Sequence, residues 1–183
     1  YKPKFGVPYF CRIRQAMQYG QTLDDYEKIM DRKNAGDYAC SWLFGDINTN
    51  EIMLYEIGLK EKSVQRTKNG VYYGMNSAMN DKLRKNETFD EDHDNITTSL
   101  GGRNHRLNEL LNKVYKGKIN IENSKKIMAD HYDTYLRRNE ENGRVICNHS
   151  EKDIRNCRYL PYDLFGCTDG KVVNTEMAKK MRF

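Results

Sequence analysis

Long apolar runs are absent from this sequence, and their absence excludes a transmembrane protein. No run approaches the roughly 18 residues that a membrane-spanning helix needs, and the longest apolar stretches are the length of strands. Proline and glycine are scarce, at 3 and 13 of 183 residues, which leaves little room for low-complexity linkers. The 13 Tyr, 6 Phe and 1 Trp exclude a disordered chain. We therefore expect a single domain over residues 1–183.

A strong excess of charge of one sign is also missing. The chain has 31 basic and 26 acidic residues, a net charge of +5. Acidic residues stand beside most of the basic ones, as in Lys60-Glu61-Lys62. Proteins that bind nucleic acids concentrate positive charge on one face or helix. We therefore expect no nucleic-acid partner.

The cysteines form no C-x-x-C pair, which argues against a zinc ribbon or a thioredoxin motif. Their number is odd, so at least one thiol is free or is paired outside the chain. The late cysteines stand ten residues apart, where one disulfide is possible. The five are Cys11, Cys40, Cys147, Cys157 and Cys167.

The histidines His93, His105, His131 and His149 show no H-x-x-x-H spacing, so we expect no metal site. His131 follows an apolar helical stripe and is predicted to be a core histidine with a satisfied hydrogen bond. Cys147 and His149 lie two residues apart on a predicted strand and would share a face. This spacing permits a Cys–His nucleophilic pair, although a structural role is the commoner use of such a pair.

An acidic run over 90–94 has the D-x-D-x-D spacing of a calcium loop. Such a loop needs Gly at its sixth position and Glu at its twelfth, where this sequence has Asn95 and Gly101. The run is therefore predicted to be a solvated acidic loop. N-x-[ST] sequons begin at Asn86, Asn95 and Asn148, but in an Asn-rich chain they are weak evidence for secretion.

Hydrophobic periodicity predicts two helices followed by a meander of four antiparallel strands. Thr22 and Asp25 form a capping-box pattern at the start of the second helix. Residues 51–58 are apolar on both faces, which predicts a strand covered on both sides. Asn69-Gly70 is the strongest hairpin signal and should join the last two strands. The predicted helices are 12–19 and 23–32, and the predicted strands are 38–45, 51–58, 62–67 and 71–75.

The second half is predicted to be mainly helical. Residues 76–98 carry many charges and few large apolar side chains, which is typical of a loop. Asn120 can cap a helix. The further elements expected are helices over 103–115 and 121–132, strands over 145–147 and 171–173, and a helix that begins near residue 174.

Several segments occur together in an order and spacing that resemble a known family. They are 38–46 with 51–52 and 56–60, then 14–19, 70–76, Arg103 with Arg106, 117–119, 129–133, 146–149 and 169–172. Together they resemble the phospholipase B-like family, which is related to the penicillin acyltransferase-like autoprocessing hydrolases.

This resemblance implies an α+β protein that is part of an N-terminal-nucleophile hydrolase. The fold of that class has four αββα layers with central antiparallel sheets. Its members cut themselves to expose a Cys, Ser or Thr whose own α-amino group serves as the base. They then cleave amide or ester bonds of acyl groups, and the resemblance implies no cofactor.

Site residues follow from the resemblance alone. Asn76 matches a position whose side-chain amide resembles an oxyanion-hole donor. Arg103 or Arg106 matches an arginine that helps to order the site. Asp130, His131 and Asp169 match motif positions for which only structural roles can be argued. We therefore take Asn76, Arg103 and Arg106 as the candidate catalytic residues.

The sequence departs from the family pattern at the nucleophile. In the family, the nucleophile precedes the segment that residues 14–19 resemble. Tyr1 has no hydroxyl or thiol on Cβ, and neither Cys11 nor Cys40 has the expected context. We therefore expect the N-terminal part of the same precursor, or another chain, to supply the nucleophile. The expected substrate is an acyl amide or a lipid-like molecule. The alternative is a catalytically inactive structural or interaction protein that keeps the fold.

The ends of the sequence favour a piece of a longer, processed protein. The chain starts at Tyr1 without Met and stops at Phe183 inside a predicted helix. A strand set that is apolar on both faces also needs two covering layers. We therefore expect these residues alone to leave an apolar sheet face exposed.

Overall fold

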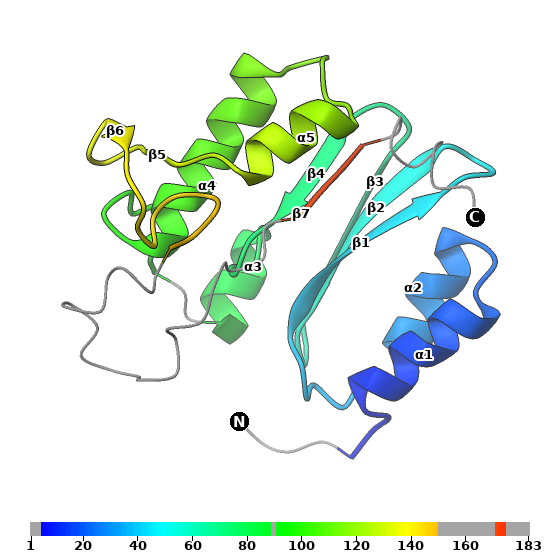
Figure 1. Cartoon of the computed structure of the whole chain (residues 1–183). Coiled ribbons are helices and arrows are strands. Elements are labelled where there is room, and N and C mark those ends of the chain that lie inside the picture. Colours follow the sequence, from blue (N-terminus) through cyan, green and yellow to red (C-terminus); the bar gives the residue numbers. More distant parts are fainter. Residues whose placement is uncertain (1–4, 89–90, 150–170, 175–183) are drawn as a thin grey trace. The chain divides into compact units, whose positions relative to one another are not determined.

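The computed structural model describes residues 5–88, 91–149 and 171–174 (Figure 1). The chain is mixed α+β and contains a small antiparallel three-stranded sheet, which agrees with the predicted class. It divides into two compact units, the first with residues 5–72, 78–88 and 173–174 and the second with 73–77, 91–149 and 171–172. None of the described helices is both long and apolar enough to cross a membrane.

The first unit contains two N-terminal helices, the three-stranded sheet and a short helical segment. The helices α1 and α2 cover one face of the sheet (Figure 1). Strand order is β1-β2-β3, and both pairs are antiparallel. The elements are α1 (Tyr9–Tyr19), α2 (Leu23–Asp31), β1 (Cys40–Asp46), β2 (Glu51–Ile57), β3 (Lys62–Thr67), α3 (Asp81–Leu83) and the π-helical turn η1 (Arg84–Thr88).

Strand β2 is buried on both faces, as its sequence predicts. One face carries Met53, Tyr55 and Ile57, which pack into the core shared with α1 and α2. The other carries Ile52 and Glu56, each no more than 1% exposed. Residues of this chain therefore cover both sides of β2, and the expected exposed apolar face is not found at this strand.

The predicted hairpin at Asn69-Gly70 is wrong. Strand β4 (Val71–Gly74) pairs with β7 (Lys171–Asn174) in a separate two-stranded sheet, and not with β3. A type I′ turn needs positive φ at both central residues, and neither Asn69 nor Gly70 has it. The Asn69 backbone N–H instead donates to Thr67 Oγ1 at 3.1 Å. This local turn directs the chain away from β3, so the predicted four-stranded meander has three strands.

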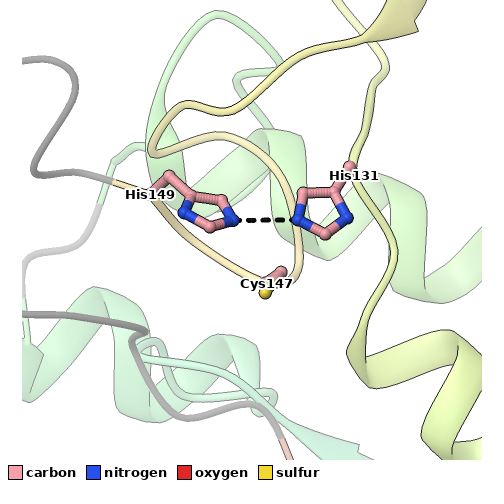
Figure 2. A group of neighbouring side chains, drawn as sticks. All are labelled: His131, Cys147 and His149. Atoms are coloured by element: carbon pink, nitrogen blue, oxygen red, sulfur yellow. Dashed lines mark hydrogen bonds between the residues drawn. The ribbon is translucent and has the colours of Figure 1, made fainter.

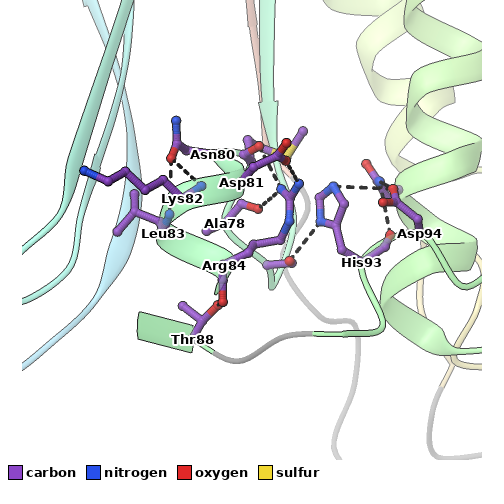
Figure 3. Close-up of polar contacts among 12 residues, drawn as sticks. Ala78, Asn80, Asp81, Lys82, Leu83, Arg84, Thr88, His93 and Asp94 are labelled. Atoms are coloured by element: carbon purple, nitrogen blue, oxygen red, sulfur yellow. Dashed lines mark hydrogen bonds and ion pairs between the residues drawn. The ribbon is translucent and has the colours of Figure 1, made fainter. Parts of the chain in front are cut away.

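The predicted loop over 76–98 contains helical structure, which corrects the sequence interpretation. The Asn80 side chain accepts hydrogen bonds from the backbone N–H groups of Lys82 and Leu83 and so begins α3 (Figure 3). Leu83 is only 2% exposed. Arg84 donates to the carbonyl of Ala78, which closes the segment on itself. A good cap and one buried leucine outweigh the polar composition here.

The second unit is built from helices, a small hairpin and ordered turns. Helix α4 begins at Ser99, four residues earlier than predicted, because the Thr98 hydroxyl accepts from the backbone N–H of Gly101. Asn120 caps α5 as predicted, by accepting from the N–H of Asn123 at 2.9 Å. The elements are α4 (Ser99–Glu109), the π-helical turn η2 (Leu110–Val114), α5 (Ile121–Met128), β5 (Tyr132–Asp133) and β6 (Arg138–Asn139).

The predicted strand over 145–147 is wrong, because those residues form turns. Its apolar residues Val145 and Ile146 are nevertheless buried, at 0% and 2% exposure. A short apolar run marks burial without deciding between strand and turn. The strand predicted over 171–173 is confirmed as β7. Asp90, Cys157, Cys167, Asp169 and the helix predicted to begin near residue 174 lie outside the described residues.

Candidate functional site

Asn76 lies at a tight bend directly after β4, and its side chain is exposed. Across the bend, the backbone N–H of Ser77 donates to the carbonyl of Met75. The Asn76 side chain takes no part in that backbone contact. Its Oδ1 instead accepts a hydrogen bond from Arg103 Nη1, 27 residues away, at 2.9 Å. The contact joins two of the residues that the family resemblance singled out.

Arg103 is fixed on α4 in a way that dictates how Asn76 is oriented. Its side chain is buried, at 3% exposure, and its Nε donates to the carbonyl of Ser99 at 3.1 Å. Burial lowers the pKa of Arg103 to about 10, so the guanidinium still carries its charge at neutral pH. A guanidinium can only donate. The oxygen of the Asn76 amide must therefore face it, and the NH₂ group must face elsewhere.

Arg106 stands one helical turn after Arg103 and holds a different segment. It makes a two-pronged contact with Asp130, from Nε at 2.9 Å and from Nη2 at 2.8 Å. Its guanidinium also lies over the ring of Tyr132, 4.5 Å from the centroid. Of the two candidate arginines, Arg103 contacts Asn76, whereas Arg106 anchors the segment that contains residues 130–132. The sequence did not separate these two roles.

The acidic run is less uniform than its sequence suggests. Asp94 is exposed, as expected, but its neighbour His93 is only 7% exposed. Ser77 Oγ lies 2.9 Å from His93 Nδ1, and Asn104 donates to the carbonyl of His93 at 3.1 Å. Tyr73 in turn donates to Asn104 at 3.1 Å. This network lies beside the Asn76 bend in sequence and supports the backbone there.

His131, Cys147 and His149 converge on one point, as Figure 2 shows. All three are half-buried, and their nitrogen and sulfur donor atoms lie within 4.8 Å of one another. The Nε2 atoms of the two histidines are 2.9 Å apart, and the rings stack at 23° with centroids 4.9 Å apart. Cys147 and His149 are neighbours, as predicted, but on a turn and not on a strand.

His131 is the member of this cluster that sequence spacing could not find. It is 18 residues from His149, and the two are joined only by the fold. The sequence predicted a core histidine with one hydrogen bond, and the structure shows a half-buried ring beside a second imidazole and a thiol. Short-range signatures such as H-x-x-x-H could not find this cluster, because its residues come from two separate turns.

The turns that carry the cluster are held together by backbone hydrogen bonds. The N–H of Cys147 donates to the carbonyl of Asp130 at 3.2 Å, and the N–H of His149 donates to the carbonyl of Asn142 at 2.9 Å. The N–H of Glu140 donates to the carbonyl of His131 at 2.9 Å. Each cluster residue is therefore tied by its own backbone to a neighbouring segment.

Asp133 organises the loop between the two histidines. It is completely buried and accepts hydrogen bonds from the backbone N–H groups of Tyr135 and Leu136. Its second oxygen accepts from Asn142 and Arg144, at 2.6 and 2.9 Å. Burial acts to raise the pKa of Asp133, but these hydrogen bonds and the Arg144 charge outweigh it and hold the pKa below its ordinary value. The loop that carries the cluster is therefore organised around a buried, charged carboxylate.

Comparison with protein-family models found no match to this chain. Comparison with curated proteins found no match either. The resemblance to the phospholipase B-like family therefore rests on the sequence segments given above, and the function must be argued from the geometry of these residues.

Proposed function

We propose that this chain is part of an N-terminal-nucleophile hydrolase that cleaves an amide or acyl-ester bond, with Asn76 as an oxyanion donor. The observation that carries the proposal is the hydrogen bond from buried Arg103 to Asn76 Oδ1. It fixes the amide with its oxygen toward α4 and leaves the NH₂ group of an exposed side chain to face a ligand. A donor held in advance stabilises developing negative charge without reorganisation.

The same contact argues against the plainer interpretation of Asn76 as a turn former. A turn-forming asparagine uses its side-chain oxygen to accept from its own backbone two residues later. Here the bend is closed by the backbone of Met75 and Ser77, and the Asn76 oxygen is directed to Arg103. Burying a charged arginine costs free energy. An asparagine that serves only a turn does not need a buried arginine to orient its amide.

In the proposed reaction the nucleophile comes from the N-terminal part of the same precursor or from another chain. Its hydroxyl or thiol attacks the acyl carbonyl, and its α-amino group takes the proton. The carbonyl oxygen becomes negative and accepts hydrogen bonds from the Asn76 NH₂ and from a backbone N–H. Collapse of this intermediate releases the protonated leaving group and leaves an acyl-enzyme, which water then hydrolyses.

Asn76→Ala tests the proposal in the processed protein that carries the nucleophile. We expect kcat to fall by about 10²–10³, because one oxyanion donor is typically worth that much. The KM should change little, since the contact strengthens only in the transition state. Asn76→Asp should be at least as damaging, because a carboxylate repels an oxyanion. The measurement is steady-state kinetics on any amide or ester that the wild type accepts.

Two further variants separate a catalytic amide from a structural one. Asn139→Ala removes another exposed asparagine, on β6, and should leave kcat unchanged. Arg103→Lys keeps a positive charge but loses the guanidinium geometry, so kcat should fall while KM is retained. If Asn76→Ala stays within about threefold of wild type, where a lost donor should cost far more, the oxyanion role is wrong. The chain then fits the alternative of an inactive structural or interaction protein.

A further inference from the structure

We propose that His131, Cys147 and His149 form a binding site for a Zn²⁺-class transition-metal ion. The two imidazole rings face one another, and Cys147 lies beside them (Figure 2). One donor atom of each of the three residues lies within 4.8 Å of the other two. Two nitrogens and one sulfur make a borderline-soft ligand set that suits Zn²⁺, whereas Mg²⁺ and Ca²⁺ prefer oxygen ligands. The inference concerns residues other than Asn76 and does not depend on the proposed hydrolase.

The distance between the two histidines fits a shared ion. Two nitrogens bound to Zn²⁺ at about 2.0–2.1 Å in tetrahedral geometry lie about 3.3 Å apart. The Nε2 atoms of His131 and His149 are 2.9 Å apart, so a small rotation of either ring creates the required separation. Without a metal, one proton must lie between these two nitrogens, because two lone pairs at that distance would repel each other. A bound ion takes the place of that proton.

The thiol completes three ligands of a four-coordinate site. A sulfur bound at about 2.3 Å lies about 3.5 Å from the nitrogens of the same tetrahedral ion. Cys147 Sγ lies within 4.8 Å of a ring nitrogen of each histidine, a gap that rotation of its side chain can close. Sites with three protein ligands and one further position, for a water or another ligand, are typical of zinc that exchanges ligands.

Hydrogen bonds hold the residues of the cluster in place in the absence of an ion, as expected for a site that is formed before the ion binds. Backbone hydrogen bonds tie Cys147 to Asp130, His149 to Asn142 and His131 to Glu140. Arg106 fixes the Asp130 carboxylate. Such supporting contacts orient metal ligands, and losing one typically costs about 10–100-fold in metal affinity. The ligands are only half-buried, so an ion can reach them from solvent.

Metal titration of the full chain tests the site. The protein is stripped with a chelator and titrated with Zn²⁺ in competition with a chromophoric chelator. We expect one tightly bound Zn²⁺ per chain and no comparable binding of Ca²⁺. Co²⁺ should give the visible bands of tetrahedral cobalt and a near-ultraviolet sulfur-to-cobalt charge-transfer band. That band reports a thiolate ligand directly in the unmutated protein.

Matched variants identify the ligands. Cys147→Ser and His131→Gln should each weaken Zn²⁺ binding by about 100-fold or more. Losing a contact that only supports a ligand costs up to about 100-fold, and losing the ligand itself should cost at least as much. Cys11→Ser and His105→Gln alter a second thiol and an exposed histidine outside the cluster, and they should bind Zn²⁺ as the wild type does. Far-ultraviolet circular dichroism of each metal-free variant checks that it is folded.

A protection experiment needs no variant. Zn²⁺ should slow the alkylation of Cys147 by iodoacetamide but not that of Cys11, as measured by peptide mass spectrometry. The proposal is overturned if Zn²⁺ gives no such protection or if the wild type shows no one-to-one binding. It is also overturned if Cys147→Ser binds Zn²⁺ within about threefold of wild type, since a true thiolate ligand is worth far more.

Discussion

At the scale of single residues, two buried charged side chains, Arg12 and Glu56, are each matched with hydrogen-bond partners. Arg12 is 1% exposed, and its guanidinium donates to the carbonyls of Val7 and Met30. Glu56 is equally buried, in the middle of β2. Burying a charge is costly unless hydrogen bonds replace its water. These residues therefore tie segments together in a way that apolar side chains could not.

Glu56→Gln should destabilise the protein. Glu56 Oε1 accepts from Ser41 Oγ and from the Met79 N–H, both at 2.7 Å, and Oε2 accepts from the Asn80 N–H at 2.8 Å. Glutamine has one acceptor oxygen, so its NH₂ group would face a backbone N–H. We expect the free energy of unfolding to fall by about 1–3 kcal/mol, the cost of a buried group left without a partner.

Urea denaturation measures this change, and Glu91→Gln is the matched control. Glu91 is exposed, so its neutralisation should alter the free energy of unfolding by less than about 0.5 kcal/mol. Equal effects of the two substitutions would show that the buried hydrogen bonds of Glu56 contribute nothing specific.

At the scale of elements, helix α4 depends on an unusually close approach of two backbones. A Cβ added at Gly101 would lie 2.2 Å from the carbonyl oxygen of Asn95 and 2.4 Å from its carbon. At Gly102 it would lie 3.0 Å from Cβ of Arg144. Positions 101 and 102 in the first turn of α4 can therefore pack closely here only because they are glycines, and the same helix carries Arg103 and Arg106.

Gly101→Ala should destabilise the protein, although alanine is the better helix former. Helix propensity alone would stabilise by about 1 kcal/mol. The obstructing atoms belong to the backbone of Asn95 and cannot rotate away, so overpacking should dominate and cost about 1–3 kcal/mol. The free energy of unfolding from urea denaturation decides the sign.

Gly74→Ala is the control for this prediction. Among the described residues, no atom lies within 4 Å of a Cβ added at Gly74, and its φ is not positive. We expect a change below about 1 kcal/mol there, the range of Gly-to-Ala effects without strain. A stabilising Gly101→Ala would mean that the Asn95 segment moves away freely.

At the scale of the whole molecule, several carboxyl groups have a pKa lowered by the fold. The hydrogen bond from the Thr22 hydroxyl lowers the pKa of Asp25. At Asp46 and Asp133 burial acts to raise the pKa, but hydrogen bonds outweigh it and the pKa lies below 3.8, its ordinary value. A carboxyl group whose pKa is lower in the folded chain stabilises the fold wherever it is ionised.

We therefore expect stability to be lost on acidification. The contribution of these groups is complete above their ordinary pKa and disappears as the pH falls through the lowered folded pKa. The free energy of unfolding should be nearly constant from about pH 7 to 5 and fall steadily below about pH 4. Asp133→Asn should lower stability at neutral pH by about 1–3 kcal/mol, because Asn142 and Arg144 lose the buried oxygen that accepts their hydrogen bonds.

The pH series itself provides the check on this prediction. Asp133→Asn should show a shallower decline in acid than the wild type, because one of the titrating groups is gone. Parallel curves for the two proteins would contradict the assignment of acid sensitivity to the Asp133 cluster.

Local sequence patterns were sufficient for two helix caps and for the burial of β2, but not for the turn at Asn69-Gly70 or for the capped helix α3. The capping box of Thr22 and Asp25 is present, and Asn120 caps α5 as predicted. The two-sided apolar pattern of β2 correctly placed it in the core. These features depend on residues within a turn of one another or on side-chain chemistry alone. Asn76 and Arg103 were chosen by resemblance, and only the fold shows that they touch.

The amino-acid sequence by itself determined the mixed α+β class, the caps, the buried strand β2 and the absence of a membrane-spanning helix among the described residues. The tertiary structure alone decided that β4 pairs with β7, that Arg103 orients Asn76, and that His131 meets Cys147 and His149. Each of these contacts joins segments far apart in the chain. Local periodicity does not indicate which distant segments come into contact, because those contacts depend on packing across the fold.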